Sequence, residues 1–299
     1  MARLQFGLDA YSPREISEKI QSAGVSKARL PFLQTAMLGV LAGAFIGLGA
    51  LYFTIVASDA MLSFAVTRVL GGVVFSLGLI LVSVAGAELF TGNNLLVMAW
   101  ADRKITAAEL LRNWCVVYMS NAVGAVGLAL MVYLAHHGSM NGGAVATTYV
   151  KIAAAKTALP FGEAFFKGVL CNVLVCLAVW LAMAGRTVVD KILAMVFPIS
   201  AFVAAGFEHS IANMYFISLG MLLADGVTLP AIVNVASLGW AGLASNLVAV
   251  TLGNIVGGSG MVALVYYMIY LRLALTEPRS AAERTRATDL HSHTGKSRK

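Results

Sequence analysis

Charged residues are scarce in this sequence. Only 12% of its 299 residues are Asp, Glu, Lys or Arg, whereas 59% are hydrophobic. A soluble globular domain carries roughly 25% charged residues. The charges that are present gather at the two ends and in short interruptions between long apolar runs. This scarcity excludes a disordered chain, argues against a soluble enzyme and indicates a protein that crosses a membrane several times.

Cysteine is also rare, and its placement excludes a disulfide framework. Cys115, Cys171 and Cys176 all lie inside apolar runs. None sits in a polar loop, and their spacing is not that of a zinc site. We therefore expect three buried thiols that pack as small hydrophobic groups, and neither a metal ion nor a cofactor.

Six apolar stretches are long enough, or nearly so, to cross a bilayer as helices, which takes about 20 residues each. The sequence therefore predicts an all-α, polytopic membrane protein. The second and fifth stretches are too long for one straight crossing, and both carry glycines and polar residues in the middle. The predicted spans are 32–57, 69–100, 110–135, 161–184, 191–223 and 244–270.

The distribution of basic residues orients these spans. With the N-terminus inside, the inner segments hold 17 Lys and Arg and the outer segments hold 4. This split favours both termini in the cytoplasm and explains the net charge of +7 without nucleic acid. The predicted organisation is a cytoplasmic N-terminal segment, a six-span channel domain and a basic, disordered cytoplasmic tail, at 1–31, 32–270 and 271–299.

The N-terminal segment is expected to contain a short amphipathic helix. Ser12, Pro13 and Glu15 have the pattern of a capped helix start. Ile16 and Ile20 then fall on one face, together with Ala23. We expect this helix to lie at the cytoplasmic surface of the membrane.

An internal repeat links the two overlong spans. Residues 86–93 and 206–213 both fit G-x-E-x4-N, and the third and sixth spans share the spacing N-x7-N-x2-G. The chain is therefore predicted to hold two copies of a three-span unit, at 32–135 and 161–270. Because each copy has an odd number of spans, the copies take opposite orientations, as in many transport folds. The shared N-x7-N-x2-G spacing pairs Asn113, Asn121 and Gly124 of the third span with Asn246, Asn254 and Gly257 of the sixth.

Three ionisable residues fall deep inside the spans: Glu88, Glu208 and His209. A carboxylate there costs at least about 2.5 kcal/mol and usually faces a bundle interior or a watery path. Either glutamate could accept N–H groups freed at a helix break, or handle protons or ions directly. Asn172 is a plausible amide partner for Glu208.

His209 is the strongest candidate for function. Its counterpart in the first copy is Leu89, and it follows a buried carboxylate at a predicted helix break. An unperturbed imidazole titrates near pH 6.5, so it can give or take a proton near neutrality. Thr91, at the first break, supplies a hydroxyl that could bond the imidazole or a small ligand.

Apolar side chains surround the predicted breaks. They either pack against lipid and neighbouring helices or form a constriction that gates by excluding water. Lys156 lies in the predicted outer loop before the fourth span, where it is either a plain surface lysine or a group that concentrates anions at a pore mouth. The apolar residues are Phe75, Leu79, Phe90, Val175 and Phe202.

Four stretches resemble the formate/nitrite transporter family. The first break, Gly86 to Gly92, resembles the family's motif in its first half, and the second, Gly206 to Met214, resembles its longer second signature. The likeness extends over about 10–272. The two further matching stretches are 171–180 and 251–255.

The resemblance implies a homopentamer of aquaporin-like protomers in the bacterial inner membrane. Each would pass small monovalent anions such as formate or nitrite, and in some members hydrosulfide, acetate or lactate. It implies that His209 is the central pore histidine with Thr91 as its partner, and that Lys156 and Asn254 form an outer polar pair. Glu208, Asn172 and Glu88 would hold the pore groups in place. The implied constriction is Phe75, Leu79, Leu89, Phe90, Val175 and Phe202.

The prediction of the preferred anion depends on short sequence stretches outside and within these motifs. Gly185-Arg186-Thr187 and residues 195–198 are more similar to formate channels, whereas Glu88 with Gly92 is closer to nitrite channels. We expect formate, with protonation through His209 making a neutral acid that crosses the apolar constriction. In the rival mechanism His209 only orients the anion. A membrane-embedded enzyme with Glu208 and His209 as acid and base is less favoured, because no nucleophile, metal-ligand cluster or cofactor motif accompanies them.

Overall fold

The computed structural model describes residues 10–229 and 233–273, and every regular element in that range is helical. Six helical segments there are long and apolar enough to cross a membrane, which confirms the prediction of six spans. The first and fourth have the predicted limits. The segments are Phe32–Ala57 (α2), Phe64–Gly86 (α3, α4 and a π-helical turn), Ala107–Leu134 (α6), Phe161–Ala184 (α8), Val188–Ala205 (α9) and Trp240–Arg272 (α11, α12 and π-helical turns).

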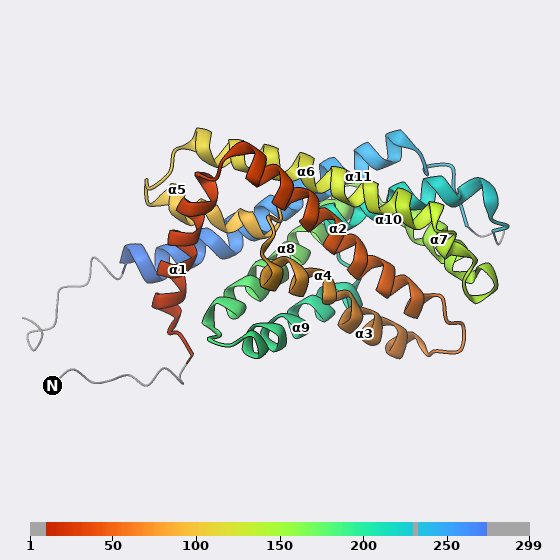
Figure 1. Cartoon of the computed structure of the whole chain (residues 1–299), viewed down its shortest axis with the longest axis horizontal. Helices are drawn as coiled ribbons and strands as arrows, with labels where there is room; N and C mark the ends of the chain where they lie inside the picture. Colours follow the sequence, from red (N-terminus) through yellow and green to blue (C-terminus); the bar gives the residue numbers. More distant parts are fainter. Residues whose placement is uncertain (1–9, 230–232, 274–299) are drawn as a thin grey trace, which may run out of the picture.

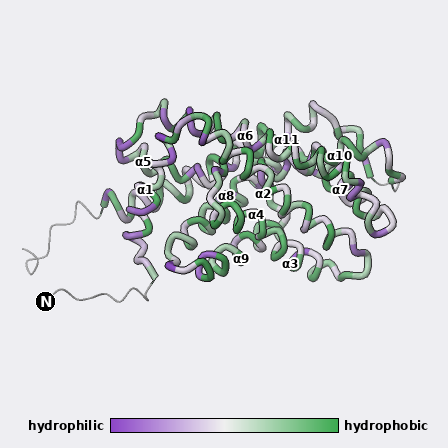
Figure 2. Tube along the Cα trace, viewed as in Figure 1, coloured by the Kyte–Doolittle hydropathy of each residue, from purple (hydrophilic) through white to green (hydrophobic). Residues whose placement is uncertain are grey.

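The spans form one elongated bundle (Figure 1). α1 (Pro13–Ala28) and the last described turn lie at the same end and contact each other. α7 (Ala144–Thr157) lies at the opposite end. Apolar residues cover the middle of the bundle, and hydrophilic residues gather most densely at the end that carries α1 (Figure 2). This is the distribution that a membrane-spanning protein needs.

Both overlong spans are interrupted at the repeated motif. The second stops at Gly86, runs without helix from Ala87 and resumes as a 3₁₀ helix at Gly92–Leu96, followed by α5 (Val97–Ala101). The fifth consists of α9, a gap over 206–209 and α10 (Ser210–Leu223). The predicted spans 69–100 and 191–223 therefore each contain a break.

Glycine ends each first half-span. Gly86 has φ 82° and Gly206 has φ 74°, which is the left-handed region that other residues adopt only with strain. Gly206 is the C-cap of α9. A glycine in this conformation turns the chain out of the helix, so both copies of the G-x-E-x4-N motif begin at the residue that stops a helix.

The N-terminal helix begins as predicted. Ser12 and Glu15 form a capping box at the start of α1. Ile16 and Ile20 are buried, and α1 packs on the ends of α5 and α8. The apolar face therefore contacts the bundle rather than lying freely on the membrane surface.

Two expectations are wrong. The segment 136–160 is not a plain loop, because α7 occupies most of it; this helix has 14 residues and so lacks the apolar length of a span. Cys115 is exposed, unlike Cys171 and Cys176, because its side of α6 faces away from the bundle. The predicted disordered tail lies outside the described residues from position 274 onward.

Candidate functional site

The bundle contains two cavities, one lined by residues of α7 and the other by residues of α1 at the opposite end. The first, here the His209 cavity, has a volume of about 250 Å³ and is lined by residues that include Lys156, Phe202 and His209. The second, here the Lys27 cavity, has a volume of about 400 Å³ and is lined by residues that include Lys27 and Glu88. They share no lining residue, so a barrier separates them.

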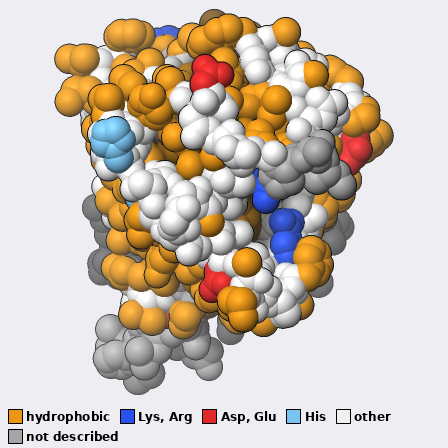
Figure 3. Space-filling model, turned by 90° about the vertical axis from the view of Figure 1, so that its right-hand side faces the viewer, with side chains coloured by type: hydrophobic (Ala, Val, Ile, Leu, Met, Phe, Trp, Pro, Cys, Tyr) orange, Lys and Arg blue, Asp and Glu red, His pale blue; other side chains and the backbone are white. Residues whose placement is uncertain are grey.

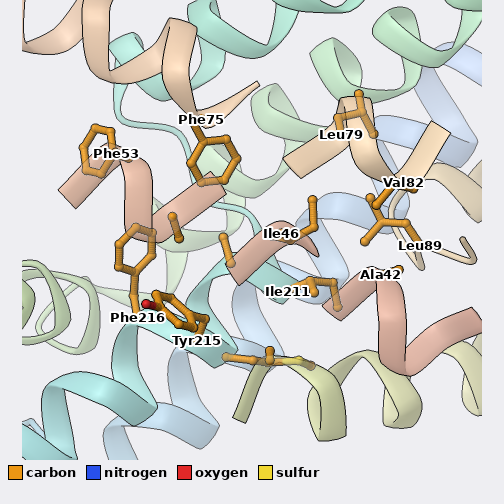
Figure 4. Close-up of a cluster of buried hydrophobic side chains, with 14 of the residues drawn as sticks. Ala42, Ile46, Phe53, Phe75, Leu79, Val82, Leu89, Ile211, Tyr215 and Phe216 are labelled. Atoms are coloured by element: carbon orange, nitrogen blue, oxygen red, sulfur yellow. The ribbon is translucent and has the colours of Figure 1, made fainter. Parts of the chain in front are cut away.

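The barrier is apolar and thin. Phe75 lines the His209 cavity and Leu79 lines the Lys27 cavity, and the two residues are four positions apart, about 6 Å along a helix axis. The Phe75 and Phe202 rings meet edge to face with centroids 5.6 Å apart. Leu79 and Leu89 are each only 2% exposed, line the Lys27 cavity and belong to one cluster of buried apolar side chains (Figure 4). Four of the six predicted constriction residues therefore lie at the barrier.

The remaining two predicted constriction residues lie elsewhere. The Phe90 ring packs edge-on against Tyr118, with centroids 4.9 Å apart, and against Trp114. Val175 is buried in the core. Neither residue lines the His209 cavity or the Lys27 cavity. Phe90 points away because its position in the break faces α6, which the sequence does not reveal.

The structure brings His209 and Thr91 together across the two breaks. Thr91 Oγ1 lies 2.9 Å from His209 Nε2. Both side chains are buried, and the Phe202 ring stacks on the imidazole with centroids 6.0 Å apart. The only ionisable ring at either break is thus placed beside the apolar barrier and against one of its aromatic residues.

Hydrogen bonds define the state of the imidazole. His209 Nδ1 accepts the backbone N–H of Ala212 over 3.1 Å, so the proton of the neutral ring is on Nε2. Nε2 then donates to Thr91 Oγ1, which leaves the hydroxyl proton of Thr91 for a further acceptor. In this arrangement the ring does not take the hydroxyl proton, as a nucleophile and its base would require.

An ion pair with an asparagine lines the Lys27 cavity. Lys27 Nζ lies 2.9 Å from Glu88 Oε1 and 3.0 Å from Asn93 Oδ1. Asn93 Nδ2 donates to Glu88 Oε2 over 2.7 Å and to Asn113 Oδ1 over 3.0 Å. Asn113 Nδ2 in turn donates a hydrogen bond to the carbonyl of Lys27 over 3.2 Å. The buried carboxylate therefore has a cation and an amide as partners.

The same arrangement recurs at the His209 cavity. Lys156 Nζ lies 2.8 Å from Glu208 Oε1. Asn213 Nδ2 donates to Glu208 Oε2 over 2.6 Å and to Asn246 Oδ1 over 2.7 Å. Asn246 Nδ2 donates to the carbonyl of Lys156 at 2.9 Å. The two halves of the chain thus make matching contacts, while the opposite orientation of the two copies stays a prediction.

Asparagines, not glutamates, satisfy the backbone at the breaks. Asn121 Oδ1 accepts the N–H of Phe90 over 2.9 Å, and its amide donates to the carbonyls of Gly39 and Glu88 over 2.8 and 2.9 Å. The expectation that Glu88 and Glu208 accept freed N–H groups is wrong, because within the described residues each carboxylate is bonded by a lysine and an asparagine side chain instead. A carboxylate cannot donate, whereas the break presents carbonyls as well as N–H groups.

Asn254 repeats this role in the second half. Its Oδ1 accepts the N–H of Ser210 over 3.0 Å, and its amide donates to the carbonyls of Gly168 and Glu208 over 2.8 and 3.0 Å. Asn254 is 0% exposed. The structure therefore places it inside the break rather than beside Lys156 at the mouth of the cavity.

Lys156 and Asn172 also differ from their predicted surroundings. Lys156 is on the last turn of α7 and its side chain is 14% exposed, so it is neither a loop residue nor a surface lysine. Asn172 Nδ2 donates to the carbonyls of Thr91 and Asn254, over 3.3 and 2.7 Å. It thus contacts the Thr91 break, and the partners of the Glu208 carboxylate are Lys156 and Asn213.

Lys27 is the residue that the sequence-based prediction missed. It ends α1 as Lys156 ends α7, and both hold the buried glutamate of their half. The signal was present in the sequence: 27–32 and 156–161 both read K-x-x-L-P-F. The correspondence of the two halves therefore includes the short helices before the first and fourth spans, beyond the predicted repeat limits.

The known proteins that are similar to this chain point to one family. The family model described as formate/nitrite transporter matches residues 14–268. The formate channel FocA of Escherichia coli K12 is 38% identical over 273 residues, which is 88% of this chain and 96% of the relative. The formate channel BtFdhC of Bacillus thuringiensis is 38% identical over 262 residues, 87% of this chain and 96% of the relative.

A solved structure has the same fold. A pentameric formate channel with formate bound superimposes with a TM-score of 0.73 at 37% identity, covering 81% of this chain and 98% of that one. The six spans, the two broken helices and the match over 14–268 lead to one assignment: this multi-pass membrane protein belongs to the formate/nitrite transporter family.

Proposed function

We propose that this protein is a transmembrane channel for small monovalent anions, with formate as the preferred substrate. The observation that carries the proposal is the buried His209–Thr91 pair, with its 2.9 Å contact, beside an apolar barrier between two cavities. The relatives named as formate channels support the choice of anion. Nitrite is the second candidate, favoured by Glu88 with Gly92 at the first break.

Proton coupling follows from the cost of crossing the barrier. A bare carboxylate that passes Phe75, Phe202 and Leu79 loses its water and meets no compensating cation among the apolar barrier residues. If the anion receives one proton from the solution on the side of entry, relayed by His209 or by water, the neutral acid crosses instead and His209 returns to its neutral state. The acid releases the proton on the other side, so one proton moves with each anion and no net charge is transferred.

A residue that lines the His209 cavity carries a buried oxygen without a hydrogen-bond partner. Asn213 lines this cavity, and its amide nitrogen is committed to Glu208 and Asn246, which fixes the orientation of the side chain. Its Oδ1 is buried and has no partner among the described residues. Burial keeps this oxygen out of contact with the cavity, so the O–H of a neutral acid or of water reaches it only after neighbouring side chains move.

The assembly belongs to the same proposal. The solved neighbour is described as pentameric, and α6 exposes a row of large apolar side chains that includes Met119, Val123 and Val126. We propose a homopentamer in which each protomer has its own path. The remaining apolar faces would contact the lipid of the bacterial inner membrane.

The test is uptake into proteoliposomes of formate and of nitrite, with and without an imposed pH gradient, together with the current carried. We expect formate uptake that is driven by the gradient and is electrically silent. His209→Asn should lower gradient-driven uptake about 10²-fold, because it removes the titratable ring.

The matched control is His136→Asn. His136 is exposed and has φ 51°, a conformation that Asn tolerates well, so uptake should not change. Anion current in the wild type, or the same pH dependence in His209→Asn, would contradict proton coupling. Faster nitrite uptake would overturn formate as the preferred anion.

A further inference from the structure

Three basic side chains line the His209 cavity, and two of them have carboxylate partners. Lys156 Nζ lies 2.8 Å from Glu208, and Lys167 Nζ lies 2.7 Å from Glu163. The third is Arg68 on α3. Within the described ranges no Asp or Glu oxygen lies within 4.0 Å of its guanidinium. Arg68 is therefore the lining cation whose charge no adjacent carboxylate balances.

The partners of Arg68 are the last carbonyls of α9. Nε donates to the carbonyl of Ala204 over 2.8 Å, and Nη2 donates to that of Val203 over 2.9 Å. A helix C-terminus carries only about half a negative charge, and the N-terminus of α10 beyond the break carries about half a positive charge. Since these two ends offset each other, the full charge of Arg68 remains as the net charge.

The position of this charge is fixed. A Cβ atom at Gly206 would lie 2.8 Å from Arg68 Nη2, so the guanidinium rests directly against the glycine of the break. Along α3, Arg68 and Phe75 are seven residues apart and share a face, about 10.5 Å from each other along the axis. Arg68 is thus held two turns from the aromatic side of the barrier.

We propose that Arg68 determines specificity for anions, a role that rests on the proposed transport function. Its unbalanced charge gives the His209 cavity a positive potential and raises the local concentration of monovalent anions before they reach Phe75 and Phe202. Low-dielectric walls strengthen such a field. Lys156, bound to Glu208, instead helps to fix the structure around the cavity. Figure 3 shows the end of the molecule that carries α7, with basic side chains in a recess between apolar and neutral ones.

The experiment is formate uptake as a function of formate concentration, in proteoliposomes with ionic strength set to about 0.01 M or about 1 M on both sides. In the wild type KM rises several-fold with salt. Arg68→Gln raises KM about tenfold at low salt and removes most of its salt dependence. Arg68→Lys keeps the charge and restores most of the low-salt KM, which a purely structural cap would not do.

The matched control is Arg103→Gln. Arg103 is exposed in the turn after α5, at the opposite end of the bundle. Its substitution therefore lowers the net charge of the protein as much as Arg68→Gln does but leaves the charge of the His209 cavity unchanged. Its KM should equal that of the wild type. Unchanged KM and salt dependence in Arg68→Gln overturn the proposal. If Arg68→Gln fails to assemble, a wild-type KM that is the same at both ionic strengths overturns it. A wild type that transports neither formate nor nitrite refutes the proposed function instead.

Discussion

At the scale of single residues, the helix breaks depend on two amides. Asn121 and Asn254 each accept one backbone N–H and donate to two backbone carbonyls. An unpaired backbone group in the membrane costs several kcal/mol. Only an amide side chain combines an acceptor with two donors in the space available. This explains why the repeat places an asparagine, rather than a carboxylate, at each position.

Removal of one of these amides should weaken the fold. Asn254→Ala leaves the N–H of Ser210 without its acceptor and two carbonyls without their donor. We expect a loss of about 2–4 kcal/mol in unfolding free energy, seen as a lower midpoint of thermal unfolding in detergent. Asn234→Ala, at an exposed position, is the control and should unfold like the wild type. Equal midpoints for the two variants would show that Asn254 does not support the break.

At the scale of elements, glycine decides where the second and fifth spans stop. Gly86 and Gly206 have positive φ angles, and the extended residues that follow present Leu89 and His209 at equivalent positions of the two halves. The chemistry differs although the backbone repeats. One half offers an apolar side chain to its cavity, and the other offers a titratable ring.

A methyl group at one of these glycines should disturb the break. Gly206→Ala forces alanine into the left-handed region, which costs about 1–2 kcal/mol, and brings Cβ against Arg68. Thermal unfolding should occur at a lower temperature, and uptake should fall because His209 moves. Gly127→Ala, inside α6 with open space around its Cβ, is the matched control and should unfold at the same or a higher temperature. If Gly206→Ala behaves like the control, the positive φ is not required.

At the scale of the whole molecule, both ends of the described chain lie at one end of the bundle (Figure 1). The excess of Lys and Arg in the predicted inner segments, 17 against 4, predicts that this end faces the cytoplasm. The Lys27 cavity would then open toward the cytoplasm, and the His209 cavity with Arg68 would open to the outside.

Reporter fusions test this orientation. Alkaline phosphatase, which is active only outside the cytoplasm, should be inactive when fused after Lys299 and active when fused after Met140, in the turn before α7. A fluorescent protein that folds only in the cytoplasm should give the reverse pattern. Phosphatase activity at the C-terminal fusion would show that the orientation is inverted, and the two cavities would exchange sides.

The amino-acid sequence alone was enough to predict the six spans, the capped start of α1, the two helix breaks and the family. These features depend on local patterns: the length of an apolar run, a Ser-x-x-Glu cap, a glycine, a repeated motif. The pairing of Thr91 with His209 could also be predicted from the sequence, because the repeat placed the two residues at equivalent breaks and a hydroxyl can form a hydrogen bond with an imidazole.

The contacts between polar groups, in contrast, became known from the three-dimensional fold. Asn172 contacts Thr91 rather than Glu208, Phe90 faces Tyr118, and Asn254 lies inside the break, because these directions depend on how helices distant in sequence cross. Lys27 and Arg68 looked like ordinary basic residues near span ends. Their contacts with Glu88 and with the end of α9 form only when the bundle folds, since Lys27 and Glu88 are 61 residues apart in the sequence and Arg68 and Val203 are 135 residues apart.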